Sequence, residues 1–285
     1  MIELGETRIG QRTFRWGERT FVMGILNVTP DSFSGDGLLA APDAVAAAVA
    51  QAVEMATEGA DLLDLGGEST RPGHATVDED EELRRTIPVV RAVRAALPTM
   101  PLTIDTTKAG VAEAALDAGA DAINDIWGVA DDTTLATLAA ACDVPLIVMH
   151  NRAEPRYDHL VEEVVDDLRR ALERATRAGV PPSHLIVDPG IGFGKSAEHN
   201  LELLRRLGEL RVLGRPILLG TSRKSTLGKV LDLPADRRLE ATLATTALGI
   251  EAGADIVRVH DVLENVRAAR MADAIVRGSW REATT

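Results

Sequence analysis

Cysteine is almost absent from this sequence of 285 residues, which contains only Cys142. A single cysteine excludes an internal disulfide and a cysteine-based zinc site, and it is typical of proteins from a reducing compartment. The neighbours of this residue are an alanine and an aspartate, which do not suggest an activated thiol. We therefore expect a buried, unreactive side chain at this position.

Long apolar runs and an excess of basic residues are missing as well. No stretch approaches the roughly 18 consecutive apolar residues of a transmembrane helix, and the N-terminus lacks the charged-then-apolar order of a signal peptide. Lys and Arg number 31 against 44 Asp and Glu, and a net charge of −13 argues against a nucleic-acid binder with a broad basic face. We expect a cytoplasmic protein that binds neither membranes nor nucleic acid.

What the sequence does contain is a repeated strand and helix pattern. Short apolar segments, each followed by a helical pattern, predict eight strands, near residues 21–26, 62–66, 102–105, 122–125, 145–149, 185–188, 217–221 and 256–260. Eight such units in about 260 residues match an α/β fold with a single (β/α)₈ TIM barrel, whereas a doubly wound sheet of this size would need a long substrate domain. We predict a barrel domain over residues 21–285, preceded by a short β-hairpin extension over residues 1–20.

The tripeptide Gly-Ala-Asp occurs directly before three of the predicted strands, at residues 59–61, 119–121 and 253–255. In each case the glycine is expected to end a helix before the strand begins. The spacing is too irregular for a solenoid but suits strand–helix units with loops of different length.

Polar residues follow nearly all of the predicted strands. In a barrel, active-site residues gather at the carboxyl ends of the strands, because only there do the eight loops converge. The residues at these ends are Asn27, Glu68 to Arg71, Asp105, Asn124 with Asp125, Met149 to Asn151, Asp188, Ser222 to Lys224, and Arg258 with His260. Only the fifth predicted strand, at residues 145–149, delivers no clear polar group. Two alternatives stay open: Asp105 could cap the following helix, and Arg258 and His260 could pair with Asp255 or Asp261.

These residues divide into two chemistries. The first set suits the edge of a flat heterocycle with amino and oxo groups and consists of Asp105, Asn124, Asp188 and Lys224. The second set suits phosphate oxygens and consists of Asn27, Thr70, Arg71, Arg258 and His260, with Asn27 as an oxygen ligand for Mg²⁺.

The loop from Asp188 to Lys195 contains three glycines, which let the backbone approach a ligand closely, and Phe193, which offers a ring to a flat partner. It contains neither the dinucleotide fingerprint nor a Walker motif. Near the N-terminus, we predict that Asn27 belongs to the fixed rim and that Asp31 to Gly37 forms a mobile lid carrying Phe33.

Five motifs together resemble the dihydropteroate synthase family, the sulfonamide target of folate synthesis, over about residues 20–278. They are GILNVTPDSFS at 24–34, GESTRPG at 67–73, DPGIGFGK at 188–195, SRK at 222–224 and RVH at 258–260. The resemblance implies condensation of 6-hydroxymethyl-7,8-dihydropterin pyrophosphate with 4-aminobenzoate, giving 7,8-dihydropteroate and pyrophosphate. It also implies Mg²⁺ as cofactor and a homodimer.

The resemblance assigns roles position by position. Asp105, Asn124, Met149, Asp188 and Lys224 would hold the pterin, while Asn27, Thr70, Arg258 and His260 would hold the pyrophosphate, with Asn27 also on Mg²⁺. Phe33, Pro72, Phe193 and Ser222 would form the aminobenzoate pocket. Catalysis would depend on Asp105, Asp188, Lys224, Asp31 and Arg71, in a dissociative displacement without a covalent enzyme intermediate. The loop at residues 151–156 departs from the family pattern, and no role is assigned to it.

Three alternatives compete with an active synthase. The first is a catalytically inactive or altered pterin-binding paralogue, although both loop motifs are intact. The second is a pterin-dependent methyltransferase, which would not need the phosphate-type donors Arg71, Arg258 and His260. The third is a non-enzymatic barrel, whose rim would resemble an ordinary surface. The apolar face of the last predicted helix, residues 262–276, could pack on the barrel or form a dimer contact.

Overall fold

The structure is a computed structural model that describes residues 4–29, 43–68, 77–129 and 132–278. Its strands are β1 Glu6–Ile9, β2 Arg12–Arg15, β3 Phe21–Asn27, β4 Leu62–Gly66, β5 Leu102–Asp105, β6 Ala122–Asp125, β7 Leu146–Met149, β8 Leu185–Asp188, β9 Leu218–Leu219 and β10 Ile256–Val259. Its α-helices are α1 Ala44–Glu58, α2 Glu79–Ala96, α3 Ala109–Ala118, α4 Thr134–Ala141, α5 Leu160–Arg177, α6 Ala197–Arg205, α7 Ser225–Leu231, α8 Leu239–Glu251 and α9 Val262–Val276. Short 3₁₀ helices are η2 Pro182–His184, η3 Leu207–Leu213 and η4 Ala235–Arg237.

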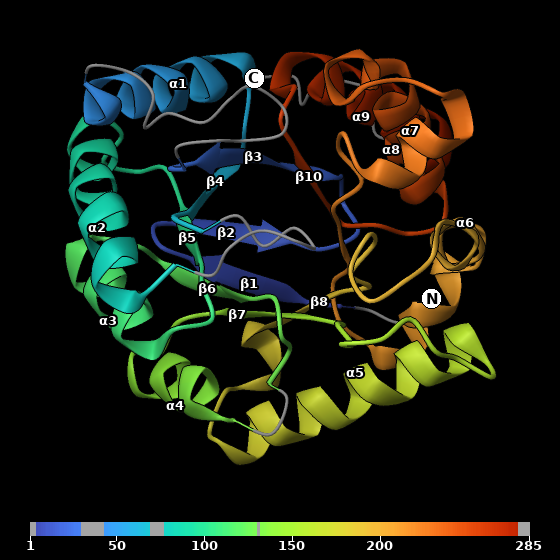
Figure 1. The fold of residues 1–285 in the computed structure, drawn as a ribbon, viewed down its shortest axis with the longest axis horizontal. Helices are drawn as coiled ribbons and strands as arrows, with labels where there is room; N and C mark the ends of the chain where they lie inside the picture. Colours follow the sequence, from blue (N-terminus) through green and yellow to red (C-terminus); the bar gives the residue numbers. More distant parts are fainter. Residues whose placement is uncertain (1–3, 30–42, 69–76, 130–131, 279–285) are drawn as a thin grey trace.

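Eight strands form one parallel sheet in the order β8-β7-β6-β5-β4-β3-β10-β9. A parallel bridge between Val187 and Ile217 joins the two outer strands and brings the sheet round on itself. The helices surround the strands as an outer ring (Figure 1). This confirms the predicted (β/α)₈ barrel. Seven strands match their predicted bounds to within one residue, whereas β9 spans only Leu218–Leu219 of the predicted 217–221.

The Gly-Ala-Asp repeats join neighbouring strands at the amino-terminal end of the barrel. Gly59 and Gly119 adopt the left-handed conformation, with φ of 104° and 115°, and end α1 and α3 as expected. The carboxylates of Asp61, Asp121 and Asp255 each accept a hydrogen bond from a backbone N–H at or next to the start of the adjacent strand, at 2.9, 2.9 and 3.1 Å. The repeat therefore ends a helix and fixes the register of the next strand.

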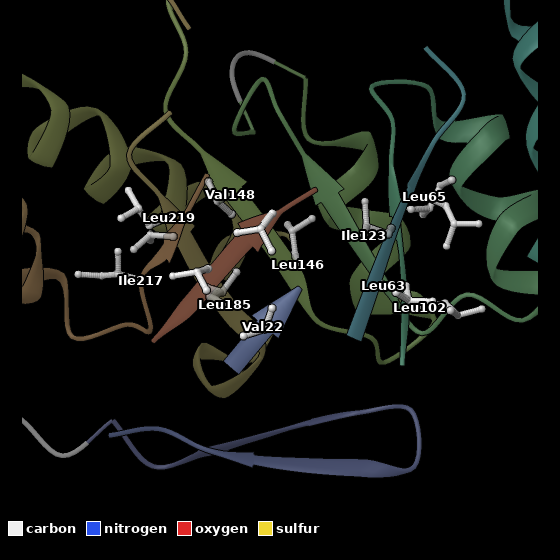
Figure 2. Close-up of a cluster of buried hydrophobic side chains, with 14 of the residues drawn as sticks. Val22, Leu63, Leu65, Leu102, Ile123, Leu146, Val148, Leu185, Ile217 and Leu219 are labelled. Carbon is white, nitrogen blue, oxygen red and sulfur yellow. The ribbon is translucent and has the colours of Figure 1, made fainter. Parts of the chain in front are cut away.

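Side chains on the two faces of the strands form two separate apolar clusters. The outward-facing side chains pack against the helices, and Figure 2 shows Leu63, Leu65, Leu102 and Ile123 among them. The inward-facing cluster lies near the starts of the strands and includes Met23, Leu62, Ala122, Ile147, Ile186, Leu218 and Ile256. Because successive residues of a strand point to opposite faces, an uninterrupted apolar strand serves both clusters.

The predicted N-terminal hairpin is present as the antiparallel pair β1–β2, and it lies across one end of the barrel (Figure 2). Phe14 and Trp16 from the hairpin pack on Phe21, with ring centroids 4.8 and 5.5 Å apart. These rings belong to the same cluster as the inward-facing apolar residues, so the hairpin closes the floor of the barrel.

The division into domains at residues 20 and 21 stays a prediction. Within the described ranges, no helix is long and apolar enough to cross a membrane.

Candidate active site

The interior of the barrel changes from apolar to polar toward the carboxyl ends of the strands. Five inward-facing apolar residues are each followed, two positions later on the same face, by a residue of the site: four of these were predicted from the sequence, and Asp64 was not. The pairs are Leu62 and Asp64, Ala122 and Asn124, Ile147 and Met149, Ile186 and Asp188, and Ile256 and Arg258. We call this second set, together with Asp105, the polar layer, although Met149 contributes a thioether. Because the hairpin closes the other end, the layer is approached from the carboxyl ends of the strands.

Arg258 connects the polar layer from one side of the barrel to the other. Its Nε donates to Asp64 Oδ2 at 2.6 Å, and its Nη2 donates to Asp105 Oδ2 at 2.9 Å. Asp64 is fully buried and also accepts from Asn124 Nδ2 at 3.0 Å. The alternative that Arg258 pairs with Asp255 or Asp261 is therefore wrong, because the arginine points inward, to acids on β4 and β5.

Asp105 does not cap a helix. The N-cap position of α3 is occupied by Lys108, so the capping alternative is also wrong. Oδ1 of Asp105 is buried and has no hydrogen-bond partner in the described part of the chain. Burial raises the pKa of Asp105 to about 7, although the charge of Arg258 opposes the shift. The carboxyl group thus keeps one acceptor position for a ligand and holds a proton more readily than an exposed aspartate.

Asp188 is tied to the glycine-rich loop that follows β8. Its Oδ1 accepts from the backbone N–H of Gly190 at 2.7 Å, and burial raises the pKa of the carboxyl group although this bond opposes the shift. Gly190 has a φ of 67°, and a Cβ there would lie 1.9 Å from the carbonyl oxygen of His150. Only glycine fits this turn, because the loop crosses directly over the end of β7.

Lys224 lies against the same loop. Its ammonium nitrogen is 4.0 Å from the centroid of the Phe193 ring, a cation–π contact. Lys224 is the N-cap residue of α7, so its position is set by the loop after β9. The predicted pterin residue Lys224 and the predicted aminobenzoate residue Phe193 are therefore brought together.

Ser222 and His260 are also in contact, although the sequence assigned them to different substrates. The hydroxyl of Ser222 lies 2.9 Å from His260 Nδ1 and accepts from the His260 backbone N–H at 3.2 Å. Ser222 is buried, with 4% of its surface exposed. Arg258 binds Asp64 and Asp105, whereas His260 contacts Ser222. The two side chains differ because β10 ends at Val259, so His260 lies beyond the strand.

Asn27 is the last residue of β3, next to Gly66 of β4, and its side chain is partly exposed at the rim. Among the residues that the structure describes, none forms a hydrogen bond with the side-chain amide of Asn27. Over the same ranges, no group of three or more His, Cys, Asp or Glu residues could hold a metal ion by itself.

Comparisons with known proteins agree with this geometry. Residues 23–260 match the family model of pterin-binding enzymes. The dihydropteroate synthase of Clostridium beijerinckii is 51% identical over 271 residues, which cover 95% of this chain and 99% of the relative. The chain belongs to the dihydropteroate synthase family. The Bacillus subtilis member is 49% identical, with 91% of this chain and 90% of the relative covered.

Solved structures of the family superpose on nearly the whole chain. The Clostridium difficile enzyme, crystallised in the presence of pteroic acid, gives a TM-score of 0.88 at 52% identity, with 93% of this chain and 99% of the other covered. The Xanthomonas albilineans enzyme with 4-aminobenzoic acid gives 0.88 at 40% identity, with coverage of 95% and 97%. The Yersinia pestis enzyme with a sulfonamide drug complex gives 0.89 at 39% identity, with coverage of 95% and 98%.

Five of the predicted family site residues lie outside the described residues. They are Asp31 and Phe33 in the first loop and Thr70, Arg71 and Pro72 in the second. The prediction that Asp31 to Gly37 forms a lid concerns the same region. The residues next to the second gap are described: Glu68 Oε1 accepts from the backbone N–H of Val77 at 3.1 Å, and Lys108 binds the carboxylates of Glu68 and Glu82.

Several members of the site could not be predicted from the sequence. Asp64 is one acidic residue within an apolar strand, and the direction of its side chain depends on the barrel. Lys195 and His150 could not be predicted either, and their side chains lie 2.8 Å apart, Nζ to Nδ1, between the ends of β7 and β8. His150 directly follows β7 and Lys195 ends the glycine-rich loop, but no local pattern in the sequence indicates that the two side chains meet.

The structure also bears on the expected burial of Cys142 and on the loop at residues 151–156, which had no assigned role. Cys142 is exposed, so the expected buried thiol is wrong; it follows α4 as its C-cap residue, where the chain turns on the surface. In the loop at residues 151–156, Arg152 binds Asp167 and Glu163, with Nη distances of 2.7 Å to both. This loop is therefore held to α5 by ion pairs.

Proposed function

We propose that this protein condenses 6-hydroxymethyl-7,8-dihydropterin pyrophosphate with 4-aminobenzoate, releasing pyrophosphate and giving 7,8-dihydropteroate. The observation that carries the proposal is the polar layer, in which Arg258 binds Asp64 and Asp105 above an apolar floor. Family membership over nearly the whole chain supports a synthase, and it favours neither a methyltransferase nor an assembly barrel.

The hydrogen-bonding groups of the layer suit a dihydropterin ring. Its ring N–H and amino groups are donors, and the layer offers acceptors: Asp105 Oδ1 is without a partner, and Asp188 Oδ1 is used by Gly190, which leaves Oδ2. Asn124 donates through Nδ2 to Asp64, which leaves its amide oxygen as an acceptor. Lys224 supplies a donor for the oxo group of the ring, and Met149 packs against the ring face.

The same acids stabilise the transition state. Positive charge spreads into the pterin as the bond between methylene carbon and oxygen breaks, and Asp105 and Asp188 lie in a buried environment where their charge acts strongly. Arg258 and His260, with Thr70 and Arg71, stabilise the departing pyrophosphate, and Asp31 belongs to the loop that closes over it. The arylamine nitrogen then attacks the methylene carbon and loses a proton, so no covalent bond to the protein forms.

Mg²⁺ fits the donor chemistry of the rim. Asn27 offers an amide oxygen, and Mg²⁺ prefers oxygen ligands while keeping several waters and substrate phosphates in its shell. We assign Asn27 to this ion. When bound, Mg²⁺ neutralises negative charge on the leaving pyrophosphate.

The aminobenzoate pocket is assigned to Phe193, Ser222, Phe33 and Pro72. The contact of Lys224 with the Phe193 ring places a cation beside this pocket, which suits a benzoate. Because the Yersinia pestis relative was solved with a sulfonamide drug, we propose that the same pocket binds sulfonamides here.

Pyrophosphate release tests the function. Release by the purified protein should require both 4-aminobenzoate and Mg²⁺, and the product should be dihydropteroate. A folded protein that binds the pterin but releases no pyrophosphate when 4-aminobenzoate is added would be the inactive paralogue. Asp105→Asn should lower kcat by about 100-fold to 1,000-fold, whereas Asp117→Asn, an exposed position on α3, should retain full activity.

We also propose a cytoplasmic homodimer. The apolar face of α9 divides into two parts: Val262, Val266, Ala269 and Ala272 are buried against the barrel, whereas Met271 and Ile275 are 61% and 73% exposed. Leu248 on the adjacent helix α8 is 63% exposed. Packing on the barrel explains only the first part, and a second copy of the chain would cover the rest.

A further inference from the structure

The loop from Gly190 to Gly194 is closed around a lysine that has no role in the reaction proposed above. Lys195 Nζ donates to the carbonyl oxygens of Gly190 at 3.1 Å and Phe193 at 3.0 Å, and to His150 Nδ1 at 2.8 Å. The three hydrogens of an ammonium group therefore each have an acceptor within the protein. Two carbonyl dipoles converge on one nitrogen and favour its ammonium form, although burial lowers the pKa of Lys195 to about 7.

His150 is prepared to accept this bond. Because Nδ1 faces the ammonium group, the proton of the neutral ring belongs on Nε2, which lies 3.1 Å from Asp167 Oδ2. Burial lowers the pKa of His150 to about 4, so the ring is neutral near pH 7. Asp167 is itself fixed by Arg152, whose Nε donates at 2.8 Å. Asp167 on α5 and Arg152 in the loop before this helix thus set the direction of the His150 ring.

The loop held by Lys195 carries Phe193, assigned to aminobenzoate, and binds Asp188, assigned to the pterin. Gly190, at one end, donates to Asp188, and Phe193, at the other end, lies under the ammonium group of Lys224. The two carbonyls that bind Lys195 belong to these same residues, Gly190 and Phe193. Two other residues also bind the loop: Tyr157 Oη donates to the Gly194 carbonyl at 2.8 Å, and Asn200 Oδ1 accepts from the Gly192 backbone N–H at 2.8 Å.

We propose that Lys195, oriented by His150, is a positioning residue that fixes Phe193 and thereby aligns the aminobenzoate pocket with the pterin site. This inference deepens the proposed function and rests on it. Lys195 lies beneath the loop and acts through backbone carbonyls, so its substitution changes the geometry of the pocket without removing a group that touches the substrates.

Lys195→Met tests the proposal, with Tyr157→Phe as the matched control, since it removes a different hydrogen bond to the same loop. Misplacing a binding group by about 1 Å costs up to ~100-fold, so Lys195→Met should lower kcat/KM for 4-aminobenzoate by about 10-fold to 100-fold, mainly through KM. Tyr157→Phe should change it by less than about threefold. If Lys195→Met folds poorly, Lys195→Gln, which keeps one donor, serves in its place.

A double-mutant cycle with Phe193→Ala separates positioning from general destabilisation. If Lys195 acts through Phe193, the double variant should be no worse than Phe193→Ala alone. Additive losses, or an unchanged KM in folded Lys195→Met, would overturn the inference. The cycle is measured twice, in turnover and in calorimetric affinity for pteroic acid. A protein that binds pteroic acid but does not turn over would count against the proposed function only, and the binding cycle would still decide the role of Lys195.

Discussion

At the scale of single residues, Asp64 connects groups that are assigned to different substrates. It accepts from Arg258 on the pyrophosphate side and from Asn124 on the pterin side, and it is fully buried. The Thr103 hydroxyl also donates to Asp64. A buried carboxylate that accepts from Arg258 and Asn124 fixes both side chains, so it defines the geometry of the layer without facing either substrate.

Replacing Asp64 with Asn should leave the Arg258 cation short of one charge partner in a buried environment. Loss of one member of a buried ion pair costs about 3–5 kcal/mol, so the free energy of unfolding should fall by that amount in urea titrations. Asp166→Asn is the control, because its ion pair with Arg169 is about half exposed and should contribute less than about 1 kcal/mol. Equal effects of the two substitutions would contradict the assigned role of Asp64.

His150 predicts a pH dependence of stability. Its pKa is about 4 in the folded protein, below the ordinary value of 6.5, so the unfolded chain binds the proton more readily. The free energy of unfolding should therefore fall as the pH is lowered from 6.5 to 4, by roughly 3 kcal/mol at about 1.4 kcal/mol per unit of pKa.

The comparison protein for this effect is His150→Asn, which offers an acceptor to Lys195 but does not titrate. Other groups change the free energy of unfolding in the opposite direction: the raised pKa of Asp105, for example, increases it as the pH falls. These contributions are the same in both proteins, so they cancel when the two free energies of unfolding are subtracted. Urea titrations at several pH values should show the steeper acid loss only with histidine at position 150. Parallel curves would assign the titration elsewhere.

At the scale of elements, the hairpin β1–β2 contributes stability at the end of the barrel opposite the site. Phe14 is 2% exposed and packs on Phe21 in the floor cluster. Phe14→Ala should lower the free energy of unfolding by about 3–5 kcal/mol, whereas Arg15→Ala, on the exposed side of the hairpin, should cost less than about 1 kcal/mol. The kcat of the folded Phe14→Ala protein should be unchanged, and a large loss of kcat would show coupling between floor and site.

Elements of this fold could be predicted well from sequence because strand and helix patterns are local. The apolar runs and the Gly-Ala-Asp repeat located all eight strands, and the polar residues at their ends indicated the rim. Contacts across the barrel could not be predicted in the same way. The partners of Arg258 are 194 and 153 residues away in the chain, and the neutral state of His150 depends on burial that exists only after folding. Exposure of Cys142 likewise depends on where α4 ends.

At the scale of the whole molecule, the exposed apolar residues of α8 and α9 predict association. Ile275→Glu would place a charge in the proposed contact, so sedimentation at micromolar concentration should show a dimer for the unsubstituted protein and a monomer for the variant. Val212→Glu is the control, because Val212 is 63% exposed but lies on η3. Dimers that persist in Ile275→Glu, or are lost in Val212→Glu, would place the contact elsewhere.

The closed floor of the barrel also sets the order in which ligands bind and leave. With Phe14, Trp16 and Phe21 filling one end, the described residues leave no passage through the floor, so the ring that we propose for the polar layer enters and leaves at the carboxyl ends of the strands. In a site that is open at one end, the ligand that binds first lies deepest and is released last. A flat ring seated on Asp105, Asn124 and Asp188 can depart only after whatever lies above it has gone.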